Sequence, residues 1–380
     1  MLRIEKRPQP SRVWVYATPV LAVVLTMIAG GLLFAALGKE PVTAIRMIFW
    51  DPLFSAQFAS FSRPQLLVKA GPLILIAIGL AIGFRANIWN IGAEGQYIIG
   101  ALFAAAVALA FFPSGPADVR LFGRVLFSYD VTPSRWWLFP LMILAGALGG
   151  FLWAMIPAIL KTRFNTKEIL VSLLLVYVAE RLLAAAAVGW LRNPEGAGFP
   201  GSRNLSRFPE AANTELFANT GMHWGVVSAF IAVIFAYVLL SRHMLGFHVQ
   251  LAGQAPRAAR FAGVAPARLV LFCLGLAGIL AGLAGMFEVS GPARMISIDF
   301  NVGYGFTAII VAFLGRLHPV GIVLAGLLMA LTYIGGELAQ FMLRLPSASI
   351  QVFQGMLLFF LLALDLLSNY RIRLAWKEAA

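Results

Sequence analysis

Polar side chains gather in one short stretch of an otherwise apolar sequence, the decapeptide NIWNIGAEGQ at residues 87–96. Its hydrogen-bonding residues are Asn87, Asn90, Glu94 and Gln96. The first three are spaced i, i+3 and i+7, which on a continuous helix places them on one face. Gly92 and Gly95 weaken a helix here, and a broken helix beside a cavity exposes polar groups to a solute. The residues alone leave two interpretations open, a pathway or gate for a polar solute and a helix start with polar caps.

A second stretch with its own chemistry is GQAPRAARFAGV at 253–264, inside the longest internal connector, 241–267. Pro256 suits the first turn of a helix and Gly263 suits its C-cap, so a short helix is expected between them. Arg257 and Arg260 then lie on one face. This basic helix is interpreted either as a docking element for a cytoplasmic partner or as a loop held at the lipid surface.

Motifs for catalysis or nucleotide binding are absent from the sequence. The one Gly-Lys pair, Gly38-Lys39, is followed by Glu40, so it does not form a phosphate-binding loop. There is no H-E-x-x-H, paired cysteine motif or G-x-S-x-G, and the two histidines beside the basic helix, His243 and His248, are a poor metal signal. The sequence therefore predicts no catalytic residue, no cofactor and no metal site on this chain.

The elements that must position these residues are membrane helices. The chain of 380 residues is 61% hydrophobic and 12% charged, with a mean hydropathy of +0.86, and a soluble domain could not cover that much apolar surface. Its net charge of +13 is spread over short connectors, which argues for membrane topology and against nucleic-acid binding. The expected class is an all-α polytopic membrane protein, and the expected partner of its surface is lipid.

About 20 apolar residues are needed to cross about 30 Å of hydrocarbon. The sequence holds about ten such stretches, of which the eighth is short, and no separate soluble domain, so residues 1–380 are expected to form a single transmembrane domain. The expected spans are 13–37, 66–84, 88–112, 138–160, 168–191, 223–240, 268–288, 302–316, 319–343 and 350–368.

Positive charge sets the expected orientation. Lys and Arg are denser in one set of connectors, which is typical of the cytoplasmic side. With the N-terminus inside, the cytoplasmic segments are 1–12, 85–87, 161–167, 241–267, 317–318 and the tail, 369–380. Both termini are therefore expected in the cytoplasm.

Ionisable residues inside spans usually face a cavity or a partner. The candidates are Lys69, Glu94, Glu180, Arg181, Glu288, Glu337 and Asp365. Glu180 and Arg181 are sequence neighbours and point about 100° apart on a helix, so each is expected to find its own structural partner. Glu94 differs from the rest because of the polar residues around it.

The sequence resembles ABC-transporter permeases of the ribose and nucleoside (simple sugar) importer class, over roughly residues 66–368. The resemblance is carried by GFRANIWNIGAEGQYIIGAL at 83–102, GQAPRAARFAGV at 253–264, NTKEILVSLLLVYVAERLL at 165–183 and GFTAIIVAFLGRLHPVG at 305–321. The third stretch departs from the family pattern, because Lys167 precedes Glu168 and Val176 precedes Tyr177. No ligand role is expected there.

The resemblance implies an ATP-driven importer permease that moves a nucleoside or simple sugar across a bacterial cell (inner) membrane by alternating access. It implies a cytoplasmic ABC ATPase that carries ATP and Mg²⁺, an extracytoplasmic solute-binding lipoprotein, and a second related permease that completes a heterodimer. The residues expected to couple to the ATPase are Gln254, Arg257, Ala258, Ala259, Arg260, Ala262 and Gly263. The main alternative is a secondary transporter driven by an ion gradient. A membrane-embedded enzyme is a third, for which no catalytic cluster is visible.

Overall fold

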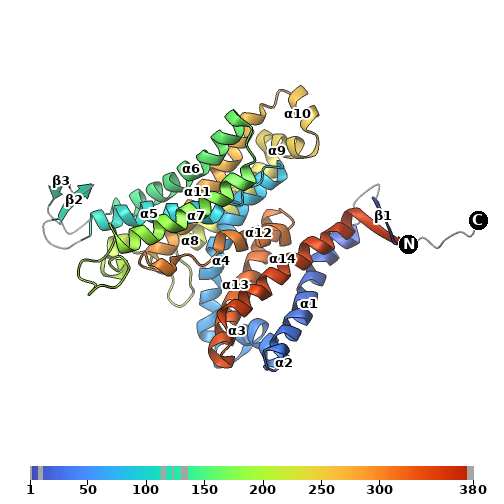
Figure 1. The fold of residues 1–380 in the computed structure, drawn as a ribbon, viewed down its shortest axis with the longest axis horizontal. Coiled ribbons are helices and arrows are strands. Elements are labelled where there is room, and N and C mark those ends of the chain that lie inside the picture. The colour runs from blue at the N-terminus through green and yellow to red at the C-terminus, as the bar shows by residue number, and fades with distance from the viewer. Residues whose placement is uncertain (1, 7–11, 113–116, 122–123, 130–135, 375–380) are drawn as a thin grey trace, which may run out of the picture. The chain divides into compact units, whose positions relative to one another are not determined.

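Nine helices in the described part of the chain are long and apolar enough to cross a bilayer. The computed structural model describes residues 2–6, 12–112, 117–121, 124–129 and 136–374. The all-α polytopic class and nine of the expected spans are thereby confirmed. The nine helices are α1 (Arg12–Ala36), α4 (Ala59–Arg85), α5 (Ala93–Ala110), α6 (Leu138–Phe164), α7 (Glu168–Val188), α8 (Trp224–Arg242), α11 (Pro266–Ser290), α13 (Pro319–Leu343) and α14 (Ser347–Asn369) (Figure 1).

The expected eighth span, 302–316, is wrong. This stretch forms α12 (Tyr304–Leu314), a helix of only 11 residues. At about 1.5 Å per residue it is roughly 16 Å long, about half of the hydrocarbon core. Glycines fix its length, because Gly303 adopts a left-handed φ of 80° just before the helix and Gly315 forms its C-cap. A helix of this length leaves one of its ends inside the bilayer.

The helices group into two compact units. The terminal unit comprises Met1–Arg63 and Leu328–Ala380, and the central unit is Pro64–Leu327. Helices α4 and α13 contribute residues to both units, and the single transmembrane domain stays a prediction. The shorter elements are α2 (Pro41–Phe49), α3 (Asp51–Phe54), α9 (Met244–Gln254), α10 (Pro256–Phe261), the 3-10 helices η1 (Leu205–Arg207), η2 (Pro209–Ala211) and η3 (Ile298–Phe300), and the strands β1 (Leu2–Lys6), β2 (Ala117–Leu121), β3 (Arg124–Tyr129) and β4 (Tyr370–Leu374).

In the terminal unit, α1, α2, α13 and α14 share an aromatic and aliphatic core. Phe34 stacks on Phe353 with ring centroids 6.1 Å apart, and Ile48 is fully buried beside them. Strand β1 pairs antiparallel with β4, which brings the two ends of the described chain together. This pairing fits the expectation that both termini lie on one side of the membrane. Residues 1, 7–11 and 375–380 of the expected cytoplasmic ends lie outside the described residues.

The central unit is built around α5, α6 and α11, which pack closely through glycines. A Cβ atom placed on Gly150 of α6 would lie against the carbonyl oxygen of Gly278 and 2.7 Å from the Cα of Gly282, both on α11. The small residues of the sequence therefore hold helix backbones together, as packing requires in lipid. A Cβ on Gly285 of α11 would likewise collide with the Tyr97 carbonyl oxygen of α5, the helix whose first turn carries Glu94.

Gly150→Ala is expected to destabilise the protein, because the added methyl group forces α6 away from α11. Added volume in a packed region typically costs about 1–3 kcal/mol, and thermal unfolding of the protein in lipid nanodiscs measures it. Gly355→Ala on α14 is the matched control, since a Cβ there meets nothing within 4 Å and alanine favours a helix over glycine. Equal melting temperatures for the two variants would contradict the close packing.

Candidate functional site

The chain breaks between α4 and α5, at the polar stretch 87–96. Helix α4 ends at Arg85 and α5 begins at Ala93, and Asn87 adopts a left-handed φ of 58°. Asn87 and Asn90 thus lie before the helix, and the expectation that they share one helical face with Glu94 is wrong. Gly92 and the asparagines favour turns here more strongly than the apolar neighbours favour a helix.

Asn90 and Gln96 lock the start of α5. The Asn90 side-chain amide donates to Gln96 Oε1 at 2.9 Å, and Gln96 Nε2 donates back to Asn90 Oδ1 at 3.2 Å. Asn90 Oδ1 also accepts the backbone N–H of Gly92 at 3.0 Å. Both side chains are buried within the chain, and their hydrogen bonds fix the turn that leads into α5.

Helix α7 holds the irregular backbone before α5 in place. The N–H of Ile91 donates to Ser172 Oγ at 3.2 Å, and a Cβ on Gly92 would lie 2.7 Å from the carbonyl oxygen of Ser172. Glu168 forms an ion pair with Lys161 and lies within 3.5 Å of the Trp89 backbone nitrogen. The break is therefore a fixed structure with its own partners.

Glu94 caps the half-length helix α12 from across the unit. Its side chain is fully buried, Oε1 accepts the N–H of Gly303 at 3.1 Å, and Oε2 accepts the N–H of Gly305. The first N–H groups of a helix lack partners within it and carry partial positive charge, which a carboxylate satisfies. Gly305 allows this approach, because a Cβ there would collide with the Glu94 backbone. Glu94 is thus a positioning residue for α12.

A chain of hydrogen bonds connects this cap to α7. Asn301, just before α12, accepts the same Gly303 N–H on Oδ1 at 3.3 Å and donates from Nδ2 to Glu180 Oε1 at 2.9 Å. Asn301 is therefore a structural partner of Glu180, as the sequence predicted for this glutamate. Arg181, which is exposed, forms no ion pair within the part of the chain that the structure describes.

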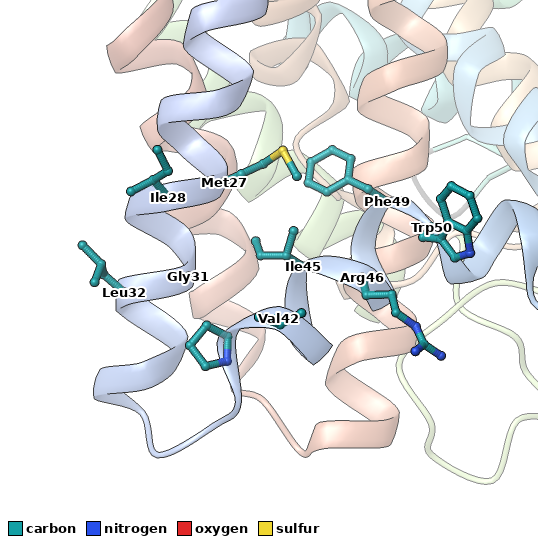
Figure 2. Close-up of a pocket in the computed structure, with 10 residues that line it drawn as sticks. Met27, Ile28, Gly31, Leu32, Val42, Ile45, Arg46, Phe49 and Trp50 are labelled. Atoms are coloured by element: carbon teal, nitrogen blue, oxygen red, sulfur yellow. The ribbon is translucent and has the colours of Figure 1, made fainter.

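A polar cavity of about 260 Å³ lies beside this connection. It is lined by Glu180, Arg181, Leu183, Ala184, Ile298, Asp299 and Asn301. A larger groove of about 750 Å³ in the terminal unit has a different character, because apart from Arg46 its lining side chains, such as Met27, Ile45 and Phe49, are apolar or aromatic (Figure 2). The cavity beside Asn301 is the better match to a polar solute.

The four residues expected at a pathway or gate are thus distributed over two environments. Asn87 is exposed, with its Oδ1 accepting the indole N–H of Trp89 at 3.0 Å, whereas Asn90, Glu94 and Gln96 are buried and bonded within the chain. A role in gating stays a prediction for them. Asn301 was missed by the sequence reasoning, although NVGYG at 301–305 repeats the signal of an asparagine and two glycines at the start of an apolar run.

The basic segment 253–264 forms the expected short helix. Helix α10 starts at Pro256, and Gly263 follows its C-cap with a left-handed φ of 79°. Six of the seven expected coupling residues are exposed, namely Gln254, Arg257, Ala258, Arg260, Ala262 and Gly263. Ala259 is only 3% exposed, so the expectation that it offers a small surface to a partner does not fit. Phe261 was not expected to matter, yet it is 95% exposed.

Two connectors expected in the cytoplasm meet the end of α4. Arg85 Nε donates to the carbonyl oxygen of Leu317 at 3.0 Å. Gly253 of α9 packs so closely that a Cβ there would collide with the Arg85 carbonyl oxygen and lie 3.3 Å from the Cα of Ala86. Figure 1 shows α9 and α10 together at one end of the central helices. The basic helix is therefore connected to the first residues of the break before α5.

Fold and site together define the membrane subunit of a transporter, with broken and half-length helices beside a polar cavity and an exposed basic helix at one end. The chain belongs to the family described as branched-chain amino acid transport system / permease component, which it matches over residues 63–362. It is therefore a multi-pass permease of an ABC importer, a class of transport subunit that leaves ATP hydrolysis to a partner and receives solute from a binding protein. Membership in this family rules against an ion-gradient-driven secondary transporter.

Similar proteins cover nearly the whole chain. It is 33% identical over 394 residues to the glucose ABC transporter permease protein TsgB13 of Haloferax volcanii, covering 99% of this chain and 96% of that one. It is 26% identical to the guanosine ABC transporter permease protein NupP of Bacillus subtilis, covering 93% and 94%. It is 27% identical to the nucleoside ABC transporter permease protein NupB of Lactococcus lactis, covering 83% and 82%. No solved structure matches the chain significantly.

Proposed function

We propose that this permease imports a nucleoside or a simple sugar by alternating access across the cell membrane. The observation that carries the proposal is the near full-length similarity to permeases named for glucose, guanosine and nucleosides. The family description names branched-chain amino acids instead. The full-length relatives favour a neutral, polyhydroxylated solute over an amino acid.

The energy source in this proposal is ATP, bound with Mg²⁺ by a cytoplasmic ATPase that docks on α10. Exposed Arg257, Arg260 and Phe261 offer charge and a large apolar side chain to such a partner, and aromatic and arginine side chains are enriched among the residues that anchor interfaces. Movement of α10 reaches the membrane through α9, because Gly253 packs on the end of α4. A binding lipoprotein delivers solute from outside, a second related permease completes the membrane core, and both termini lie in the cytoplasm.

The test is uptake into proteoliposomes that contain this permease, its second permease and the ATPase, with the purified binding protein on the opposite side. Labelled guanosine, glucose and leucine are the probes. We expect uptake of guanosine or glucose that requires ATP and survives collapse of proton and sodium gradients by ionophores. Uptake driven by an ion gradient without the ATPase, or uptake of leucine alone, would overturn the proposal.

A further inference from the structure

The polar cavity beside Asn301 lies at membrane depth by two separate measures. Helix α7 starts at Glu168, so at about 1.5 Å per residue Arg181 is roughly 20 Å along it. Helix α12, which begins three residues after Asn301 and ends two residues before Arg316, has 11 residues and is roughly 16 Å long. Glu168 and Leu317 both lie close to the break that follows α4, through their bonds to Trp89 and Arg85. The two estimates therefore place Arg181 and Asn301 at similar depth in a bilayer of about 30 Å.

Charged side chains at this depth in the bilayer indicate a water-filled cavity. Charged side chains within spans almost always face the bundle interior or a water-filled cavity. Arg181 and Asp299 are exposed on this chain, Glu180 is half-buried, and all three line the same cavity. Neither Arg181 nor Asp299 has an ion-pair partner among the residues of the chain that are described. Leu174 and Val178 are exposed on the same face of α7 as Arg181, so the cavity is the polar part of an otherwise largely apolar face.

The cavity offers acceptors and donors side by side. Glu180 Oε1 accepts from Asn301 at 2.9 Å, while Oε2 makes no hydrogen bond to any other described residue. An ionised carboxylate only accepts, and a guanidinium only donates. Neighbouring hydroxyl groups on a sugar ring do both, so one can donate to Glu180 Oε2 while another accepts from Arg181. A volume of about 260 Å³ is many times the space of about 10–15 Å³ that one water needs, so the cavity has room for a small polar solute such as a sugar ring.

We propose that this cavity is a sugar subsite of the translocation pathway, in which Glu180 and Arg181 bind neighbouring hydroxyl groups of the carbohydrate and Asn301 positions Glu180. The inference rests on the proposed function and adds the part of the solute that is recognised. A zwitterionic amino acid is the competing occupant, because a carboxylate beside a guanidinium also matches its two charges. The hydrogen bond between Asn301 and Gly303, which Glu94 shares, ties the subsite to the cap of α12.

The experiment combines protein variants with altered solutes. Proteoliposomes of the complete transporter, with its binding protein, are given guanosine and 2′,3′-dideoxyguanosine, or glucose and 2,3-dideoxyglucose, whichever pair the wild type carries. Glu180→Gln and Asn301→Ala are compared with wild type. Selection by the binding protein is the same for all permeases, so it cancels when each variant's ratio of uptake rates is divided by the wild-type ratio.

We expect Glu180→Gln to lower uptake of the hydroxylated solute about threefold to tenfold, because a neutral amide replaces the charge-assisted hydrogen bond to the hydroxyl group, and that of the dideoxy solute little. Asn301→Ala should act in the same direction more weakly. Tyr177→Phe is the matched control, because Tyr177 is exposed on α7 but does not line the cavity. Co-purification of the ATPase and basal ATP hydrolysis show that each complex is assembled.

Equal loss for both solutes, or no loss in either variant, would overturn the subsite and leave the proposed function standing. A wild-type transporter that carries leucine and neither carbohydrate would overturn the proposed function itself, together with the subsite. Loss of leucine uptake in Glu180→Gln in that case would assign the cavity to the amino acid.

Discussion

Replacing Glu94 by alanine is expected to lower transport at least about tenfold while the complex still assembles. The change leaves the buried N–H of Gly305 without its acceptor and leaves the Gly303 N–H with Asn301 Oδ1 alone, and an unpaired buried donor typically costs about 1–3 kcal/mol. The start of α12 then shifts, and with it Asn301. Uptake of labelled solute into proteoliposomes measures the loss, and co-purification with the partner subunits tests assembly.

Glu94→Gln separates charge from hydrogen bonding. A glutamine keeps one acceptor oxygen but turns an NH₂ group toward the second donor, so its transport should fall between wild type and the alanine variant. Asn90→Ala should also lower transport, since it removes the partner of Gln96 and Gly92. Glu210→Ala, in the loop 192–222 outside the spans, is the control. Wild-type rates in both Glu94→Ala and Asn90→Ala would reduce this region to ordinary helix-start capping.

The sequence could predict that the polar stretch 87–96 interrupts a helix, but not which residues its polar side chains contact. Gly92, Gly95 and the asparagines are a local signal of a broken helix, and the break is there. The partners of Glu94 lie more than 200 residues away, at Gly303 and Gly305, and no periodicity within one sequence reveals a contact of that range. Its capping role therefore became visible only when α5 and α12 were placed side by side.

Hydropathy predicts the long membrane helices correctly, but it does not predict that α12 is too short to cross the bilayer. The reason is again a contact that is distant in the sequence. Residues 302–316 are as apolar as a span, but the left-handed Gly303 and the C-cap at Gly315 stop α12 after 11 residues. Composition reports where apolar residues are, whereas the ends of a helix depend on caps, one of which is supplied by α5. Pro256 and Gly263, by contrast, set the limits of α10 by local chemistry alone, so that helix was predicted well.

Changes on the exposed face of α10 are expected to separate the permease from its ATPase. Phe261→Ser removes a side chain that is 95% exposed, and truncating an aromatic anchor of an interface typically costs about 2 kcal/mol or more. Ala258→Trp adds bulk at an exposed position of the same helix. Both variants should retain less ATPase on co-purification, or transport less solute per ATP, with the membrane helices still folded.

Arg260→Glu should weaken the same association by reversing a charge, and its effect should diminish with added salt because exposed charges are screened. Ala259→Trp is a different test, since Ala259 is buried within the chain and its replacement should lower the protein's own thermal stability.

Phe199→Ser is the matched control, because Phe199 is 75% exposed but lies in the loop 192–222, expected on the opposite side of the membrane. If Phe261→Ser, Ala258→Trp and Arg260→Glu all bind the ATPase and couple as well as Phe199→Ser, α10 is a basic connector at the lipid surface. The motion that drives alternating access must then enter the permease through another of the connectors, such as 161–167, since Lys161 pairs with Glu168 at the start of α7 and Glu168 holds the break before α5.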